Sequence, residues 1–406
     1  MKSIWKHVSL ASVLICSLTP AVRAAELDTI FLPYGFINAS YWAADHAVGS
    51  LGNLNSNFSA PVAAGIDSGV GDNNSRRSRG AFEVQQSRFG FQVMPKSNVR
   101  GKFEFDFLNA ANAAPATASL LRLRIAKIEW LVNDTNMVLI GQDWDLFNAG
   151  VNPHTHNWVG NYFQGGNAGF MRQQLVFLHH TDAVEVAGAV GMAQNTALNP
   201  VANSAPTGAA FPTNNSDSDF SVPSLAFKAA MVNGKDRVGV AALYAPRISA
   251  VTVAGLDTDN SHTAFGAAAF AIYNISDFEV RAKAYWGQDL KDTGAFSISS
   301  IVAGTAGNPA HDTHEIGGFL SIARTFNSEW SSYAGFGYAK IAEDYQLATN
   351  ALMRNWQVKA GGEYMIPDTK AKMFLELTRY ATEYKIAAGP TDFNAYVGQV
   401  GVEMAF

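Results

Sequence analysis

Apolar and polar residues alternate with a period of two over long stretches of this 406-residue chain. Between residues 99 and 108, apolar positions alternate with four charged ones, Arg100, Lys102, Glu104 and Asp106. The same alternation recurs over residues 278–286 and 396–406. Because successive side chains of a strand point to opposite faces, each stretch predicts a β-strand with one apolar and one polar face.

The pattern predicts sixteen such strands, and most exceed the roughly 9–11 residues with which a tilted strand crosses a bilayer. An even number of antiparallel strands is typical of single-chain bacterial barrels. The predicted fold class is therefore all-β, a sixteen-stranded antiparallel transmembrane β-barrel. The strands are expected at residues 31–41, 81–94, 98–108, 120–131, 136–147, 170–180, 183–194, 223–232, 236–246, 262–274, 277–288, 314–326, 329–342, 353–366, 370–383 and 394–406.

The connections between these segments alternate in length. Seven are short polar turns, among them residues 95–97 and 181–182, and the other eight are loops, among them residues 42–80, 148–169 and 195–222. This sorting is typical of outer-membrane barrels, whose short turns face the periplasm. Tyr and Trp gather near the predicted strand ends, at the level where lipid headgroups would lie. A soluble β-sandwich, the alternative, has no reason to sort its connections in this way.

The first residues have the pattern of a secretory signal peptide. Lys2 and Lys6 precede an apolar run at residues 8–18, which a small-residue segment around Ala24 follows. We therefore expect residues 1–24 to be removed and residues 25–406 to form a single outer-membrane barrel domain. A short N-terminal anchor is the alternative, but the apolar run is too short to cross a membrane.

Composition narrows the class of protein further. Charged residues make up 16% of the chain, below the roughly 25% of a soluble domain. The single cysteine, Cys16, lies in the expected leader, so we predict no disulfide in the exported protein. Beyond the leader the most apolar stretch, residues 264–273, has about half the length of a membrane helix. The sequence therefore excludes a multi-helix membrane protein.

Several short motifs fall in the predicted strands: Ser87-Arg88-Phe89-Gly90-Phe91, Leu121-Arg122-Leu123-Arg124, Gly141-Gln142-Asp143-Trp144, Arg172-Gln173-Gln174 and the terminal Phe406. In these motifs the chain resembles the bacterial general porins and, in detail, the DcaP-type trimeric outer-membrane porins. The resemblance implies a homotrimer among outer-membrane lipids, an inward-folded third loop, and dicarboxylates or similar acids as favoured solutes. Small residues on the predicted outer faces would let copies of the barrel pack together: Ala267, Ala269, Ala282, Ala284 and Gly398.

Basic residues gather on the predicted inward faces of neighbouring strands. Arg122 and Arg124 lie two positions apart on one strand, so their side chains project to the same side about 7 Å apart. No acidic residue lies at the next alternate positions, Leu120 and Ala126. A basic wall would raise the concentration of anions in a pore. The candidate wall comprises Arg88, Arg100, Lys102, Arg122, Arg124, Arg172, Arg281, Lys283 and Lys359.

Two other readings of these charges remain open. Glu104 and Asp106 on the adjacent strand can pair with Arg122 and Arg124, which would make the group structural. Polar residues inside a wide barrel can also be merely solvated.

The third loop, residues 148–169, contains no Asp, Glu, Lys or Arg. Its candidate constriction residues are Pro153, His154, His156, Trp158 and Tyr162. A neutral loop would leave the positive charge of a facing wall uncompensated. We therefore predict an outer-membrane porin that passes small hydrophilic solutes, with a preference for anions such as dicarboxylates.

No catalytic motif is found. The chain lacks Gly-x-Ser-x-Gly, a Walker loop and His-Glu-x-x-His, so we predict no enzyme, no cofactor, no metal and no nucleic-acid partner. Residues 154–156 and 311–315 contain histidines and acids, but in no spacing of a known metal site. Two alternatives stay open: a structural or adhesive barrel with a plugged lumen, and a hydrolase with catalytic groups on a barrel wall.

Overall fold

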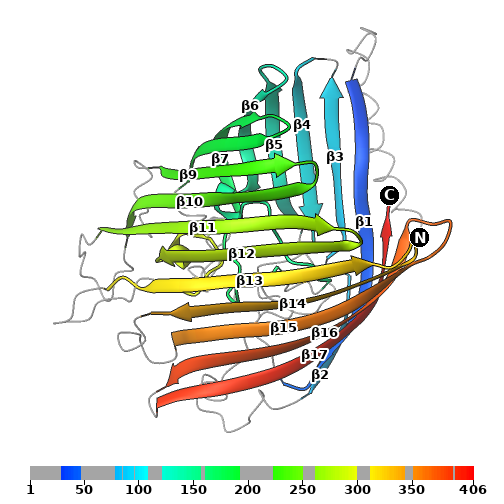
Figure 1. Ribbon diagram of the computed structural model, residues 1–406, viewed down its shortest axis with the longest axis vertical. Coiled ribbons are helices and arrows are strands. Elements are labelled where there is room, and N and C mark those ends of the chain that lie inside the picture. Colours follow the sequence, from blue (N-terminus) through cyan, green and yellow to red (C-terminus); the bar gives the residue numbers. More distant parts are fainter. Residues whose placement is uncertain are drawn as a thin grey trace, which may run out of the picture.

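The alternating segments form a single antiparallel sheet in the computed structural model of the protein (Figure 1). The structure describes residues 29–46, 78–84, 86–95, 97–107, 121–156, 161–192, 223–249, 261–299, 311–342, 351–386 and 389–406, and the expected leader, residues 1–24, lies outside them. The strands are β1 (Thr29–Ala44), β2 (Arg79–Glu83), β3 (Arg88–Pro95), β4 (Val99–Asp106), β5 (Arg122–Leu131), β6 (Asn136–Trp144), β7 (Met171–His180), β8 (Val184–Gly191), β9 (Ser224–Asn233), β10 (Asp236–Ser249), β11 (Ser261–Ile275), β12 (Phe278–Gln288), β13 (His314–Thr325), β14 (Trp330–Ile341), β15 (Ala351–Met365), β16 (Ala371–Ile386) and β17 (Gly389–Ala405). Two 3-10 helices, η2 (Leu146–Asn148) and η5 (Leu290–Thr293), follow β6 and β12. Among the described residues, no helix is long and apolar enough to cross a membrane.

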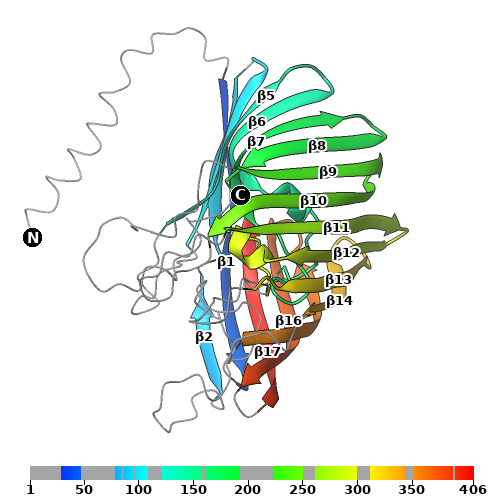
Figure 2. The ribbon, with the colours of Figure 1, turned by 90° about the vertical axis from the view of Figure 1, so that its left-hand side faces the viewer.

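The sheet closes into a barrel because β1 pairs with β17, the last strand, as well as with β2 and β3. Seen from the side, β5 to β14 follow one another along one flank, and β1 and β2 lie on another (Figure 2). Residues 40–44 of β1 lie against β2, and residues 29–36 lie against β3. β2 and β3 thus occupy one place in the wall, and the seventeen strand segments fill the sixteen places that the sequence predicts. Closure leaves no sheet edge whose backbone groups would need water.

The strand predicted over residues 81–94 is interrupted between β2 and β3. Residues 36 and 40 of β1 lie opposite residues 88 and 83, so four steps along β1 match five along its partner. An extra residue on one strand is a β-bulge, which locally breaks the ladder. The Ser87 hydroxyl fills the break, because it accepts a hydrogen bond from the Asn38 amide at 3.0 Å and donates to the Asn38 carbonyl at 3.2 Å.

Apolar side chains point outward from the strands and polar ones point inward, as the alternation predicts. On β12, Trp286 is 44% exposed on the outside, whereas Tyr285 and Lys283 are buried inside. Large apolar side chains are exposed in the same way on the described strands from β1 to β17. Exposed apolar surface costs about 25 cal/mol per Å² in water, so this exterior suits the hydrocarbon of a bilayer.

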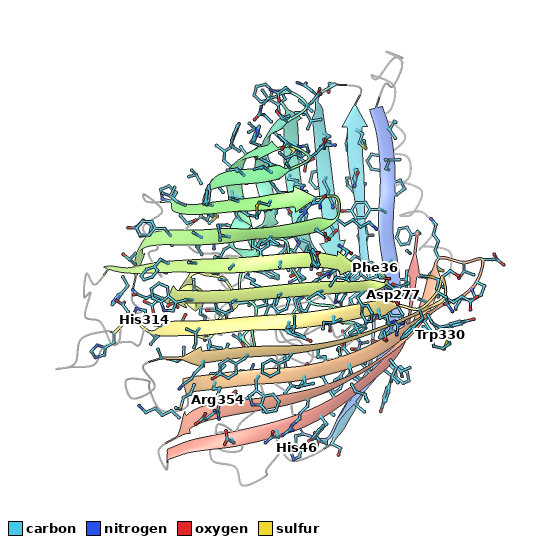
Figure 3. All side chains as sticks on the ribbon, in the orientation of Figure 1. Phe36, His46, Asp277, His314, Trp330 and Arg354 are labelled. Carbon is cyan, nitrogen blue, oxygen red and sulfur yellow. The ribbon has the colours of Figure 1, made fainter. Side chains whose placement is uncertain are left out.

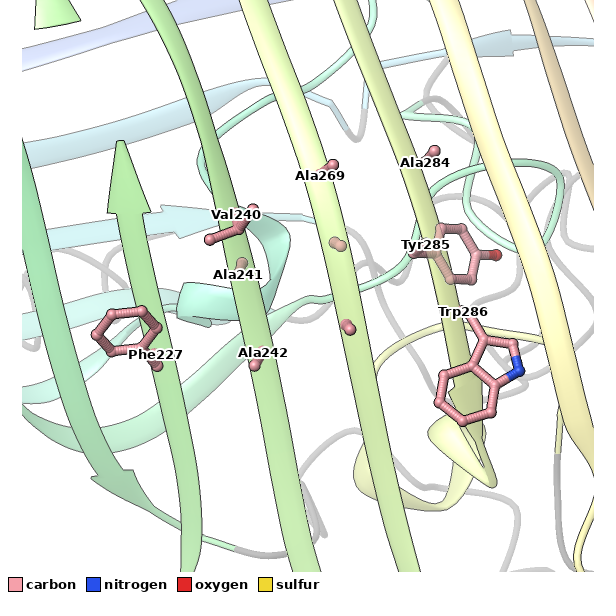
Figure 4. A pocket seen from close by; sticks show the side chains of 10 residues that line it. Phe227, Val240, Ala241, Ala242, Ala269, Ala284, Tyr285 and Trp286 are labelled. Atoms are coloured by element: carbon pink, nitrogen blue, oxygen red, sulfur yellow. The ribbon is translucent and has the colours of Figure 1, made fainter. Parts of the chain in front are cut away.

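A shallow apolar hollow of about 560 Å³ lies on the outer face of β9–β12 (Figure 4). Alanines form its floor, and the larger rings of Phe227 and Trp286 stand on its two sides. Ala267, Ala269 and Ala284, three of the predicted small outer residues, belong to this floor. Because the alanine side chains of the floor are small, another apolar surface can approach the backbone closely there.

The two ends of the barrel differ, as the connection lengths predict. Asp277 and Trp330 mark the end with short turns, and His314 marks the opposite rim (Figure 3). One connection at the His314 rim departs from the prediction. β16 and β17 remain paired as far as Ile386 opposite Gly389, so extended strands replace most of the loop predicted there. Cross-strand pairing continues past the end of the alternating pattern, which is why the pattern did not reveal it.

The connection between β6 and β7 folds into the barrel, as the resemblance implies. Its first part, η2, packs against β8–β11, and Tyr162 is fully buried against β14. β14 admits the loop because glycines stand at the contact. A Cβ added to Gly335 would lie 2.3 Å from the Tyr162 hydroxyl oxygen, and one added to Gly337 would lie 2.2 Å from the Gly165 carbonyl oxygen. The predicted barrel with an inward-folded third loop is confirmed.

We expect Gly337→Ala to loosen the loop, because the new methyl group occupies the place of the Gly165 carbonyl. Overpacking costs about 1–3 kcal/mol, which corresponds to a roughly tenfold larger population of open loop. Limited chymotrypsin digestion of the folded barrel should then cut near Tyr162 about ten times faster. Gly362→Ala is the matched control, since a Cβ there meets only the Ser331 carbonyl oxygen at an ordinary 3.7 Å. Equal cleavage rates in the two variants would contradict the role of Gly337.

Candidate functional site

The third loop divides the inner surface of the barrel into two parts. It lies against the inner faces of β8–β16, which we call the loop-covered wall. The inner faces of β1 and β3–β5 lie on the other side of the lumen, and we call them the facing wall. The space between the loop and the facing wall is the candidate functional site.

Lys283 of β12 holds both ends of the loop. Its buried ammonium donates to the carbonyl oxygens of Phe147 at 2.9 Å and Ala168 at 2.6 Å, and to the side-chain oxygen of Asn167 at 3.2 Å. It also lies 5.0 Å from the centre of the Phe147 ring. An ammonium carries three donors, so it satisfies acceptors that the irregular loop backbone leaves without partners.

Glu376 of β16 holds the middle of the loop. Its fully buried carboxylate accepts hydrogen bonds from the Thr155 hydroxyl at 2.8 Å, the His156 amide at 2.8 Å and the Tyr333 hydroxyl at 2.7 Å. The ammonium of Lys359, also fully buried, lies 3.5 Å from this carboxylate and 3.4 Å from the Thr155 hydroxyl. A buried charge is stable only when it is paired and hydrogen-bonded, and here the loop supplies part of that environment.

His154 adds a third attachment. Its Nε2 lies 3.1 Å from a Glu279 oxygen, and its Nδ1 lies 2.9 Å from the Ser321 hydroxyl. Arg281 pairs with the same Glu279 and donates to the carbonyl oxygen of Asn152 at 3.0 Å. Burial, with Arg281 close by, lowers the pKa of His154.

His156 is attached elsewhere. Its ring contacts Glu363 and stacks on Phe374 with 4.1 Å between the ring centres. The two loop imidazoles therefore face different carboxylates, and they do not come together as the ligands of one metal ion.

Arg172 of β7 connects the third loop to the long connection after β12. Its Nε donates to the Asp145 carboxylate at 2.6 Å, and its Nη2 donates to the carbonyl oxygen of Thr293 in η5 at 2.9 Å. The side chain is 3% exposed, so Arg172 is a cross-link between two connections at this rim.

On the facing wall, two arginines of β5 pair with two carboxylates of β4. Arg122 Nε donates to Asp106 at 2.9 Å, and Arg124 donates to Glu104 at 2.8 Å and to Asp106 at 3.0 Å. Such charge-assisted bonds are among the strongest in proteins. The sequence left open whether acidic residues of the neighbouring strand pair with Arg122 and Arg124. In the structure, Glu104 and Asp106 supply these counter-charges.

A β-bulge explains which residues line the wall beyond Arg124. β5 has one extra residue opposite positions 104 and 105 of β4, so its alternation shifts by one. Lys127 therefore points inward, where unbroken alternation predicts Ala126, and it donates to Asp143 of β6 at 2.6 Å. A shift of one residue moves every following side chain of a strand to the other face.

Two further cations of this wall lie over aromatic rings. Arg88 of β3 stands 5.4 Å from the centre of the Phe36 ring, and the Lys102 ammonium of β4 stands 4.9 Å from that of Tyr34. In the part of the chain that the structure describes, neither has a carboxylate within ion-pair distance. Arg100, whose side chain is 40% exposed, pairs with Glu129 at 2.8 Å.

The predicted basic wall thus divides into two groups. Three residues of the predicted basic wall are buried: Lys283 and Lys359 contact the third loop, and Arg172 contacts Asp145 and the Thr293 carbonyl oxygen. Arg281 likewise reaches the loop. The other five predicted residues do share the facing wall, on neighbouring strands: Arg88, Arg100, Lys102, Arg122 and Arg124.

The predicted constriction residues Pro153, His154, His156 and Tyr162 lie in the inward-folded loop, and Trp158 lies outside the described residues. The sequence reasoning missed the carboxylates that receive this loop, Glu279, Glu363 and Glu376. An acidic residue between outward-facing apolar ones, such as Glu376 between Leu375 and Leu377, was the available signal.

Comparisons with known proteins agree with this architecture. No family model matches the chain, and no curated protein matches it. Among solved structures, the outer membrane channel DcaP of Acinetobacter baumannii is similar with a TM-score of 0.71 at 15% identity, over 94% of this chain and 99% of that one. An anion-selective porin from Comamonas acidovorans has a TM-score of 0.57 at 9% identity, over 93% and 100%. A loop L8 deletion mutant of the Vibrio cholerae outer membrane protein OmpT has a TM-score of 0.55 at 12% identity, over 93% and 100%. The chain has the fold of the bacterial outer-membrane porins.

We expect Lys283→Met to release both ends of the loop from β12 while the barrel stays folded. Each buried acceptor that loses its donor costs about 1–3 kcal/mol, so the loop is the part that opens. Hydrogen exchange followed by mass spectrometry should show amides of residues 145–156 and 161–169 exchanging faster, with strand amides unchanged. Lys102→Met removes a cation that no loop contact uses and should leave the loop protected. Unchanged exchange in Lys283→Met would show that the other attachments suffice.

Proposed function

We propose that the protein is an outer-membrane porin through which small hydrophilic solutes diffuse passively, with a preference for anions such as dicarboxylates. The observation that carries this proposal is the placement of an uncharged loop opposite a wall with an excess of basic side chains. The expected leader, residues 1–24, would direct export. The apolar exterior would contact the lipids of the outer membrane.

The excess of positive charge lies on β3, β4 and β5 of the facing wall. These strands carry six basic side chains and three carboxylates on the wall: Arg88, Arg100, Lys102, Arg122, Arg124 and Lys127, with Glu104, Asp106 and Glu129. Glu104 and Asp106 are paired with Arg122 and Arg124, and Glu129 is paired with Arg100 and Lys127. Arg88 and Lys102 remain as the source of the local field, and a low-dielectric wall focuses such a field into the lumen.

The loop does not offset that excess. Residues 148–169 contain no charged side chain other than histidine, and both histidines are turned to carboxylates of the loop-covered wall. The three acidic residues of that wall that meet the loop, Glu279, Glu363 and Glu376, are occupied in holding it. An anion between loop and wall would therefore meet net positive charge on one side and neutral groups on the other. Guanidinium forks and ammonium groups suit carboxylates, which supports dicarboxylates as solutes.

A homotrimer is the assembly that we propose. The alanine floor of the outer hollow gives β10–β12 a flat apolar surface on which a second barrel can pack. Native mass measurements of the detergent-solubilised protein distinguish a trimer from a monomer.

Planar-bilayer recording tests the central claim. Open channels with a reversal potential that favours anions in a salt gradient support it. A barrel that never conducts would overturn the proposal in favour of a structural or adhesive barrel with a plugged lumen, or of a barrel hydrolase.

We expect Lys102→Glu to reduce the ratio of anion to cation permeability at least about twofold, since two units of charge change on the wall that a passing ion faces. Folding should persist, because Lys102 takes part in no described ion pair. Lys370→Glu makes the same charge change in the exposed turn after β15 and is the control. If both variants keep the wild-type reversal potential, the facing wall does not set selectivity.

Deletion of residues 153–165 should raise single-channel conductance. The side chains of Asn152 and Asn167 are in contact at 3.5 Å, so the cut ends can be rejoined through Gly166. The contacts of Lys283 with Phe147 and Ala168 lie outside the deletion and keep the remainder attached. A conductance equal to that of the full chain would mean that the loop does not narrow the pore.

A further inference from the structure

Three side chains with metal-binding atoms meet at the rim where β11 begins, β12 ends and β13 begins. They are His262 of β11, Asp289 just before η5, and Asp312 just before β13. One ligand atom from each lies within 4.8 Å of the others. The pairing of β12 with β13, in which Gln288 is opposite His314, brings the two aspartates together. Their separation in sequence hides this arrangement.

Asp289 is the buried member of the group. It is 0% exposed, and its Oδ1 accepts hydrogen bonds from the Thr313 amide at 2.9 Å and the Thr313 hydroxyl at 3.4 Å. Its Oδ2 is buried and has no hydrogen-bond partner in the described part of the chain. Oδ2 is therefore the Asp289 oxygen that can bind a ligand in the cluster. A buried acceptor without a partner is costly, so a ligand for it is expected.

The other two members complete a set of mixed donors. His262 and Asp312 are in direct contact, and the Nε2 of His262 is buried without a hydrogen-bond partner among the described residues. The Asp312 side chain is 39% exposed, which leaves a path for an ion from solvent. Asp289 and Asp312 lie in the same cluster, and two carboxylates side by side need a shared proton or a cation between them.

We propose that His262, Asp289 and Asp312 bind a divalent transition-metal ion, with Zn²⁺ as the ion that fits best. Zn²⁺ takes imidazole nitrogen and carboxylate oxygen together, at about 2.0–2.2 Å, and a fourth position would be left to water. Ligand atoms on opposite sides of such an ion lie at most about 4 Å apart, so only a small side-chain rotation separates the observed cluster from a closed site. Mg²⁺ and Ca²⁺ prefer oxygen ligands alone and would not use His262.

A metal ion at this site would link two connections at the rim of the barrel. Residue 262 follows the connection between β10 and β11, whereas residues 289 and 312 flank the connection between β12 and β13. An ion bound to all three would fasten these two connections to each other. Because the ligands come together only in the folded barrel, binding would stabilise the fold. Metal binding at this site does not depend on the proposed porin function.

Isothermal titration of the full, chelator-treated protein with ZnCl₂ at pH 7.5 tests the site. The expected result is one high-affinity Zn²⁺ per chain, with affinity falling at least tenfold in His262→Gln and in Asp289→Asn. His314→Gln is the matched control: this nearby imidazole stacks on Trp286 outside the cluster and should leave binding unchanged. No binding in the wild type, which would mean that the aspartates share a proton, overturns the proposal. Equal affinity in the wild type and both cluster variants overturns it too.

X-ray absorption at the zinc edge of the wild-type complex keeps the test valid if a variant fails to fold. The spectrum should report one imidazole nitrogen and carboxylate oxygens at about 2.0–2.2 Å. A shell with two or more imidazoles would place the ion at other histidines and refute this site. Binding of Mg²⁺ alone as tightly as Zn²⁺ would refute the role of His262.

Discussion

The contact between a buried ammonium and the backbone of a loop determines the interior of this barrel. Lys283 donates to carbonyl groups at both ends of the third loop, and Glu376 accepts hydrogen bonds from its middle. Irregular backbone inside a barrel has polar groups that need partners, and water or side chains of the wall must supply them. Here charged side chains of the wall do so, and the path of the loop across β8–β16 follows from their positions.

This arrangement gives the charges inside the barrel two different roles. On the loop-covered wall, Lys283 and Glu376 are buried in contacts with the loop and Lys359 pairs with Glu376, so these charges act on structure. On the facing wall, ion pairs between β4 and β5 hold Arg122 and Arg124, while Arg88 and Lys102 lie over aromatic rings with no carboxylate of the described residues within ion-pair distance. The proposed anion preference therefore rests on fewer residues than a count of inward-facing cations suggests.

The connections at this rim of the barrel contact one another. Arg172 joins the third loop to η5, and Asp289, the residue before η5, belongs to the cluster with His262 and Asp312. A bound metal ion would make this part of the structure more rigid, because it would hold three separate segments at one point.

The sequence by itself determined the barrel. Alternation is a local property of an extended chain, so the strand segments, their apolar exterior and the sorting of turns and loops could all be predicted without knowing which strands pair. The neutrality of the third loop was readable for the same reason. Partners inside the barrel depend on register, and register depends on bulges that leave no clear local mark. The bulge in β5 turned Lys127 inward in place of Ala126, and pairing with β4 placed Asp106 between Arg122 and Arg124. Only the tertiary structure decided that Lys283 anchors a loop and that His262 meets Asp289, because those contacts join residues far apart in the chain whose positions are set by closure of the whole sheet.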